Sequence, residues 1–218
     1  MSTGNAKVVV FDLWHTLIYG LSTDPIVTLW KSMAGDEEPC PSEFLEACLT
    51  TDIGDPDAFV TAMAARFDRK ANRALKRFFR KLTASEREAI GLYPDTLKVL
   101  DELEGRGKRL VLASNLWPFP LPRVDEVLDL SRFEHLTYSF RVGVRKPAGE
   151  LFADITGALS VPASDCVMVG DSIGSDIVGG LSAGMEAVYI CRSAQIGQVP
   201  DDVPAKAAVV TSLSELLD

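Results

Sequence analysis

Short, continuously apolar runs alternate along this chain with stretches of helical spacing. The runs are Lys7–Phe11, Arg109–Ala113, Leu136–Phe140, Asp165–Val169, Glu186–Ile190 and, more weakly, Ala207–Val210. Such runs are typical of strands buried on both faces, as in a parallel sheet. The helical stretches are Asp95–Glu104, Gly149–Leu159 and Asp176–Ala183, the last ending at Gly184. The pattern predicts an α/β fold with a Rossmann-like parallel sheet, which binds ligands at the carboxyl ends of its strands.

The segment between the first two apolar runs breaks this alternation. Residues 18–91 contain helical patterns and Pro/Gly/Asp turns, without a convincing strand. We therefore expect a helical subdomain over 18–91, inserted into a core formed by residues 1–17 and 92–218. Trp30, Met33 and the apolar residues of Leu45–Leu49 are candidate walls of a substrate pocket, although helical aromatics and methionines more often form core.

Charge divides the insertion into two halves. Lys31–Val60 carries a net charge of -7 and Arg66–Lys81 a net charge of +7. In the basic half, helical spacing puts one group of apolar side chains on a common face: Phe67, Ala71, Ala74, Leu75 and Phe78. The basic side chains then form either a solvated face, partly paired with the acidic half, or a patch that attracts an anionic substrate.

Composition excludes several classes of protein. The 218 residues carry a net charge of -9, the wrong sign for a general nucleic-acid-binding surface. The longest uncharged run, Leu110–Pro122, is too short to span a bilayer. A charged residue also interrupts the start of the chain before a signal-peptide stretch could form. We expect a soluble, cytoplasmic protein with no membrane or nucleic-acid partner.

Cysteine and histidine limit the available chemistry further. The four cysteines form no C-x-x-C pair, and Cys166 and Cys191 lie in apolar runs, as small buried side chains do. The two histidines are too few for a multi-histidine metal site.

Polar residues follow four of the apolar runs. Asp12 follows the first, Ser114-Asn115 closes the second, Lys146 comes after the third, and Asp171 and Asp176 follow the fourth. In a parallel sheet these segments meet at one edge. Carboxylate oxygens suit Mg²⁺, and a lysine with a serine hydroxyl can hold phosphate oxygens. The sequence thus predicts a site for a hard cation and a phosphate.

The order and spacing of these segments resemble the haloacid dehalogenase-like superfamily of aspartate-nucleophile hydrolases. Three further strings support the likeness: Leu92-Tyr93-Pro94, Val142-Gly143-Val144-Arg145-Lys146-Pro147, and Val169-Gly170-Asp171-Ser172 with Asp176 and Gly184-Met185. The insertion resembles the small helical cap of the first cap class in that superfamily. We refer to residues 18–91 as the cap.

The resemblance implies a role for each residue. Asp12 would attack phosphorus and form an aspartyl-phosphate. The metal, Mg²⁺, would bind Asp12, Asp171 and the backbone carbonyl of Trp14, with Asp176 supporting it directly or through water. Phosphate binding and charge neutralisation would fall to Ser114, Asn115, Lys146 and Thr16, the last also buttressing the turn after the nucleophile. The implied activity is hydrolysis of a small phosphorylated metabolite.

Trp14 departs from the superfamily pattern. Phosphatases of this type carry a second aspartate at that position, as the general acid, and an indole cannot replace it. Three interpretations stay open. The substrate has a leaving group that needs little protonation; His15 or the substrate supplies the proton; or the protein binds without turning over.

Two other functions compete with a phosphatase. The metal-free haloacid dehalogenases carry an aromatic residue at the position of Trp14 and a Ser-Asn pair like Ser114-Asn115, but replace the leading metal-binding aspartate, which this chain keeps as Asp171. Two acids facing Asp12 favour a metal, and therefore a phosphate. The third possibility is a non-catalytic binding or regulatory protein on the same fold.

Overall fold

The computed structural model describes residues 6–192 and 200–218. A parallel sheet forms its centre, with strands in the order β5-β4-β1-β6-β7-β8. The strands are β1 (Val8–Phe11), β4 (Arg109–Ser114), β5 (His135–Tyr138), β6 (Cys166–Gly170), β7 (Glu186–Ile190) and β8 (Ala208–Val210). All five pairings are parallel. The predicted fold class is therefore confirmed, and so is the expected burial of Cys166 and Cys191.

Strand register explains why the polar residues meet. Phe11 of β1 lies between Leu112 of β4 and Val169 of β6. The segments after these three strands consequently leave the sheet at the same edge. One strand is shorter than predicted, because the chain turns after Tyr138 into the short helix α7 (Ser139–Val142).

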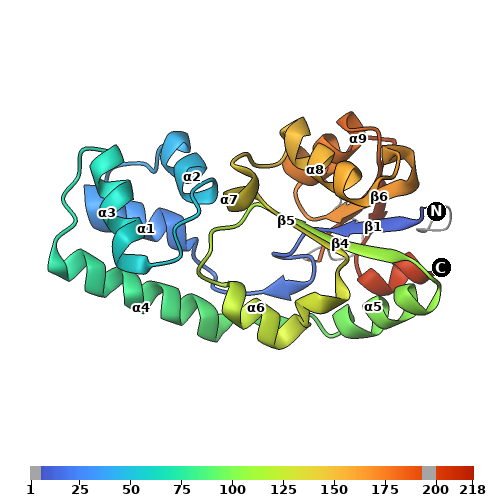
Figure 1. The fold of residues 1–218 in the computed structure, drawn as a ribbon, viewed down its shortest axis with the longest axis horizontal. Helices are drawn as coiled ribbons and strands as arrows, with labels where there is room; N and C mark the ends of the chain where they lie inside the picture. The colour runs from blue at the N-terminus through green and yellow to red at the C-terminus, as the bar shows by residue number, and fades with distance from the viewer. Residues whose placement is uncertain (1–5, 193–199) are drawn as a thin grey trace.

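Helices cover both faces of the sheet (Figure 1). α5 (Thr96–Gly105) and α6 (Leu121–Leu128) lie on one face, and α8 (Gly149–Leu159) and α9 (Gly179–Ser182) on the other. The predicted helix over Asp176–Ala183 is divided into a π-helical turn (Ile173–Val178) and α9. Gly184 follows with a φ of 86°, a left-handed conformation that favours glycine.

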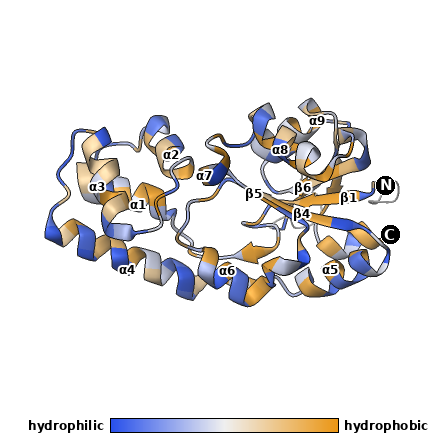
Figure 2. Ribbon diagram, viewed as in Figure 1, coloured by the Kyte–Doolittle hydropathy of each residue, from blue (hydrophilic) through white to orange (hydrophobic). Residues whose placement is uncertain are grey.

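The four cap helices lie beside the sheet rather than on it, on the left of Figure 1. They are α1 (Pro25–Ala34), α2 (Ser42–Leu49), α3 (Pro56–Arg66) and α4 (Arg73–Ala89). Asp24, Asp55 and Asn72 cap the first, third and fourth with side-chain oxygens. The hydropathy colouring in Figure 2 shows α4 with alternating polar and apolar positions, as expected for a helix with one buried face.

The cap has its own apolar cluster. Trp30 is 2% exposed within it and Met33 packs against it, so these two candidates are core rather than pocket wall. Two side chains from outside the cap join the cluster, Trp117 and Phe119, from the connection between β4 and α6. Cap and core therefore share buried aromatic surface.

The expectation of one helix across the basic half, Arg66–Lys81, is wrong. α3 ends at Arg66 and α4 starts at Arg73, with Asp68 at a φ of 52° between them. The Asn72 side chain accepts the backbone N–H of Leu75 and fixes the start of α4. The buried face then runs through Leu75, Phe79, Thr83 and Glu86. Phe78, predicted on the apolar face, is 38% exposed.

Two short strands also interrupt the region expected to be free of strands. β2 (Ile18–Tyr19) pairs antiparallel with β3 (Gly91–Leu92) at the junction of cap and core. Gly91 lies directly against the Tyr19 ring, where a Cβ atom would overlap the phenol. Two residues are too few for an alternating pattern, so the sequence does not reveal this ribbon. Within the described ranges, no helix combines the length and apolar character that a membrane span needs.

Candidate active site

Lys146 stands at the centre of the polar residues that follow the strands. Its Nζ lies 2.6 Å from Asp12 Oδ1, 2.6 Å from Asp176 Oδ1 and 2.7 Å from the carbonyl oxygen of Ala113. Its side chain is 1% exposed. Two hydrogen bonds, to Asp12 and Ala113, and an ion pair with Asp176 thus hold the lysine head in place.

Three carboxylates gather around this ammonium. Asp12, Asp171 and Asp176 each offer an oxygen, and these oxygens lie within 4.8 Å of one another. Asp12 follows β1 directly, and Asp171 follows β6. Asp176, buried in the π-helical turn, accepts the backbone N–H of Ser172 at 3.0 Å. Gly170 makes room for it, because a Cβ atom there would overlap the Asp176 carboxyl.

This cluster contains more acidic than basic side chains, and their burial and mutual contacts shift their pKa values. Burial raises the pKa of Asp12; Lys146 lowers it, and Asp176 and Asp171 raise it again. Burial and the neighbouring Asp176 raise the pKa of Asp171 to about 6. Burial would lower the pKa of Lys146, but Asp12 and Asp176 together raise it. Three acids share one positive charge, an arrangement in which a divalent cation with oxygen ligands fits.

Two buried hydroxyls at the same edge have unused hydrogen-bonding capacity. Ser114 Oγ and Thr16 Oγ1 are buried without a hydrogen-bond partner among the described residues. Buried hydroxyls are normally bonded, so each has capacity for a ligand oxygen. The sequence placed both residues at the phosphate-binding site. The structure puts them at this edge, and their contact with phosphate remains a prediction.

Asn115 is engaged differently from what was expected. Its Oδ1 accepts the backbone N–H of Lys146 at 2.7 Å, and its Nδ2 donates to the carbonyl of Lys146 at 3.1 Å. The side chain therefore fixes the Lys146 backbone. A direct bond from Asn115 to phosphate would have to use the remaining N–H proton.

Sequence reasoning missed the residues that hold the turn after Asp12. Arg192 donates to the carbonyl of Thr16 from Nε at 2.9 Å and from Nη2 at 2.6 Å. The same guanidinium bonds both carboxylate oxygens of Asp95 and lies 3.8 Å from the centre of the Tyr93 ring. No local signal marks Arg192, since its partners lie far from it in sequence.

A cavity of about 490 Å³ opens beside this edge, between cap and core. Trp14, His15 and Asn115 line it from the core, and Leu45 and Leu49 line it from α2. Trp14 is held against Gly20, where a Cβ atom would overlap the indole. Of the candidate pocket residues on α2, Leu45 and Leu49 thus reach the cavity, while Ala47 and Cys48 are buried in the apolar cluster of the cap.

The cavity also contains an acid that the sequence reading missed, Glu86 of α4. A signal for it exists, because Glu86 continues the buried stripe of Leu75, Phe79 and Thr83. An acid on an apolar stripe is unusual enough to single out. Glu86 lies beyond Lys81, the end of the basic half, and the stripe that leads to it passes through Phe79 and not through Phe78 as predicted.

The basic half of the cap faces elsewhere. The described lining of the cavity contains no lysine or arginine. Two of the basic side chains pair with acids of the cap, Arg69 with Glu38 at 2.6 Å and Arg80 with Asp57 at 3.1 Å. These observations favour the interpretation of a solvated, partly paired face.

Comparisons with known proteins agree with this geometry. Residues 6–184 match the haloacid dehalogenase-like hydrolases, and the chain belongs to that family. It is 32% identical to mouse N-acylneuraminate-9-phosphatase over 127 residues, 57% of this chain and 50% of the mouse protein. It is also 32% identical to Thermus thermophilus phosphoserine phosphatase over 139 residues, 62% of this chain and 51% of that protein. The matches thus span about half the length of these curated relatives.

Solved structures show the same fold over nearly the whole chain. A phosphatase of this family from Thermococcus onnurineus superposes with a TM-score of 0.63 at 21% identity, covering 96% of this chain and 95% of the other. A 2-haloacid dehalogenase from Pseudomonas syringae gives a TM-score of 0.65 at 21% identity, covering 97% and 96%. At such identities the likeness establishes the fold and not the reaction.

Proposed function

We propose that this protein is a Mg²⁺-dependent phosphatase that hydrolyses a small phosphorylated metabolite through an aspartyl-phosphate on Asp12. One observation carries the proposal: Asp12 shares Lys146 with Asp176, and a third carboxylate, Asp171, lies within 4.8 Å. Without a metal, the single positive charge of Lys146 would have to balance three carboxylates. The phosphatase names of the curated relatives support the same class of substrate.

The reaction has two displacements at phosphorus. A carboxylate oxygen of Asp12 attacks the phosphorus, and the bond from phosphorus to the leaving oxygen breaks. A water molecule then attacks the phosphorus of the aspartyl-phosphate. The bond to the Asp12 oxygen breaks, which releases inorganic phosphate and restores the carboxylate.

Each neighbouring residue has a part in this chemistry. Lys146 reduces repulsion between Asp12 and the incoming phosphate, and Asn115 fixes the Lys146 backbone. Ser114, whose hydroxyl has no partner within the described part of the chain, donates to a phosphoryl oxygen. Asp12, Asp171 and the Trp14 carbonyl would hold Mg²⁺, with Asp176 supporting. When bound, the cation neutralises charge on the phosphoryl group.

Proton transfer to the leaving oxygen is the step for which the position two residues after Asp12 supplies no acid. The Trp14 indole lines the cavity and cannot donate a proton of useful acidity. The leaving group therefore departs with little protonation or takes its proton from the substrate or from His15, which also lines the cavity. Acyl, enol and aryl phosphates satisfy the first condition.

Phosphate release from phenyl phosphate tests the function. We expect release that requires Mg²⁺, stops with a chelator and is lost in Asp12→Asn. Asp36→Asn, an exposed acid of the cap, is the control. Borohydride reduction of acid-quenched enzyme should convert phosphorylated Asp12 to homoserine, which peptide mass spectrometry detects. Chloride release from 2-chloropropionate that a chelator does not affect would instead identify a dehalogenase. Turnover of neither substrate would identify a binding protein.

A further inference from the structure

Glu86 is a buried acid with no counter-charge among the residues that the structure describes. It lies near the end of α4 and is 3% exposed. Among the described residues its one hydrogen-bond donor is the indole N–H of Trp117, 3.0 Å from Oε1 and 3.2 Å from Oε2. None of the ion pairs in the described ranges includes it. A carboxylate can accept about four hydrogen bonds, and buried acids are normally paired, so most of its capacity is unused.

The same acid lines the cavity that lies beside the proposed catalytic edge, next to residues that directly follow it in sequence. Trp14 and Asn115, also in the lining, come two residues after Asp12 and one after Ser114. A phosphate held by Asp12 and Ser114 would therefore direct its organic group into this space. About 490 Å³ is enough for a metabolite-sized group. Apolar walls from Leu21, Ile26, Leu45 and Leu49 leave Glu86 as a buried polar group that such a ligand would meet.

The charge of the lining selects between kinds of organic group. The described lining has two acids, Glu86 and Asp24, and His15 is its one side chain able to become cationic. Asp24 already accepts the backbone N–H groups of Ile26 and Val27. A second anionic group on the substrate would be desolvated beside these acids. A hydroxyl or an ammonium group would instead supply the donor that Glu86 lacks.

We propose that Glu86 determines substrate specificity by accepting a hydrogen bond from a hydroxyl or ammonium group on the organic part of the substrate. The substrate is then a phosphate monoester of a polyol or an amino alcohol that carries no second anionic group. This inference rests on the proposed phosphatase function for its substrate, while the binding site itself is a property of the cavity.

A matched series of alkyl monophosphates tests the specificity. The chains end in an amine, a hydroxyl, a methyl or a carboxylate group, at increasing length. We expect kcat/KM to be highest for amine or hydroxyl ends, lower for methyl and lowest for carboxylate. The length with the largest preference locates Glu86 relative to the phosphate. A wild-type enzyme that prefers the carboxylate-ended esters would overturn the inference.

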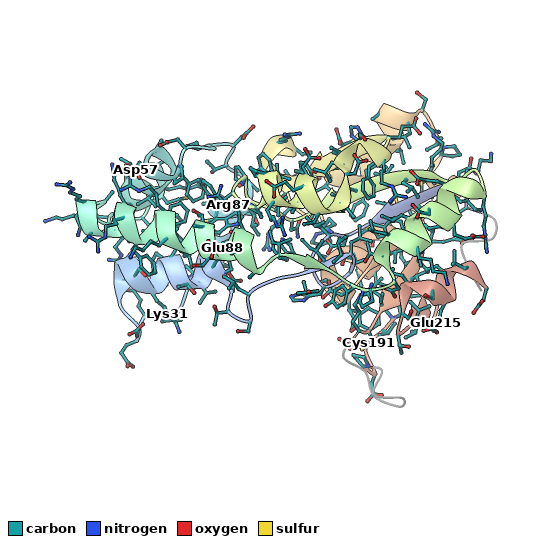
Figure 3. The ribbon with its side chains drawn as sticks, turned by 90° about the horizontal axis from the view of Figure 1, so that it is seen from below. Lys31, Asp57, Arg87, Glu88, Cys191 and Glu215 are labelled. Atoms are coloured by element: carbon teal, nitrogen blue, oxygen red, sulfur yellow. The ribbon has the colours of Figure 1, made fainter. Side chains whose placement is uncertain are left out.

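Two substitutions of Glu86 separate its charge from its acceptor oxygens. Glu86→Gln removes the charge and keeps an acceptor, and Glu86→Met removes both. We expect the preference for amine over methyl ends to fall about ten- to a hundredfold in Glu86→Gln. The preference for hydroxyl ends should survive there in part and disappear in Glu86→Met. Glu88→Gln, an exposed acid two residues further along α4 (Figure 3), is the control. Unchanged preferences in both Glu86 variants would refute the role.

A binding measurement tests ligand recognition in the cavity without requiring turnover. Saturation-transfer NMR with the parent amino alcohols and diols should detect binding to wild-type protein and not to Glu86→Met. If no ester, phenyl phosphate included, releases phosphate, the proposed function fails while this measurement still decides the inference. If phosphate is released but these alcohols bind wild type and Glu86→Met alike, the inference fails and the phosphatase stands.

Discussion

At the residue scale, the candidate site is organised by competition for one ammonium group. Lys146 Nζ donates to Asp12 and to the Ala113 carbonyl and forms an ion pair with Asp176, whereas Asp171 is not among these partners. Asp171 is also the least buried of the three acids. The residue with the least support from the protein is thus the one best placed to bind a cation from solvent.

Trp14 sets the first prediction at this scale. Trp14→Asp places an acid two residues after Asp12, the proposed nucleophile, where it can protonate a leaving oxygen. Poor leaving groups gain most from a general acid, so activity on alkyl phosphates should rise by about 10²-fold or more relative to activity on phenyl phosphate. Paired kcat/KM measurements on the two substrates check this. Trp14→Asn, which opens the same space without an acid, is the control, and an equal gain in both variants would contradict the argument.

Glu86 gives a prediction for stability. Burial raises its pKa from 4.5 to about 7. Below pH 4.5 the carboxyl is protonated in both folded and unfolded chains. As the pH rises to 7 the unfolded chain ionises first, so the folded state loses up to about 3 kcal/mol of stability. Above pH 7 that cost is constant.

Glu86→Gln should remove this dependence. The difference in free energy of unfolding, variant minus wild type, is expected to grow by up to about 3 kcal/mol between pH 4.5 and 7 and then level off. Urea denaturation across this range measures it. Glu88→Gln should show no such growth, because Glu88 is exposed. If the difference in free energy of unfolding between Glu86→Gln and wild type did not change with pH, solvent or an ion would have to reach the carboxyl.

At the scale of elements, the sequence predicts what local pattern determines. Four strands, β1, β4, β6 and β7, are almost wholly buried and contain nearly uninterrupted apolar runs, so their existence and parallel arrangement follow from the pattern. Alternation of strand and helix then brings Asp12, Ser114, Lys146 and Asp171 to one edge. Most of the candidate site is therefore predictable before any coordinates are known.

Elements whose start depends on one helix-capping side chain, or whose position depends on partners distant in sequence, are not predictable in this way. The pattern of the basic half predicts one helix. The Asn72 side chain instead caps the start of α4, and the buried face of α4 passes through Phe79 where the prediction had Phe78. Asp95 and Arg192 join the start of α5, the Thr16 turn and the C-terminal segment near Ser212. Their contacts join residues 97 to 176 positions apart in the sequence, and no periodicity records them.

At the scale of the whole molecule, cap and core are joined by side chains as well as by the connecting strands. Ser139 of α7 donates to the carbonyl of Leu49 at 2.6 Å, and Arg145, next to Lys146, pairs with Glu46 of α2. Phe119 meets Phe59 and Phe79 edge to face, with centroids 5.0 and 5.1 Å apart. The polypeptide that carries Ser114 thus continues directly into the apolar cluster of the cap.

This shared cluster makes the cap depend on the core for folding. We expect wild-type protein to unfold in one transition, because neither part buries its aromatic surface alone. Phe119→Ala should lower the free energy of unfolding by about 3–5 kcal/mol. It should also separate urea transitions followed by tryptophan fluorescence from those followed by far-UV circular dichroism, because two of the three tryptophans, Trp30 and Trp117, lie in this cluster. Phe152→Ala, equally buried against the sheet, should lower stability similarly while the transitions stay coincident. If Phe119→Ala also keeps them coincident, the cap and core are coupled through the ribbon of β2 and β3 and the polar contacts of α2 rather than through the aromatic cluster.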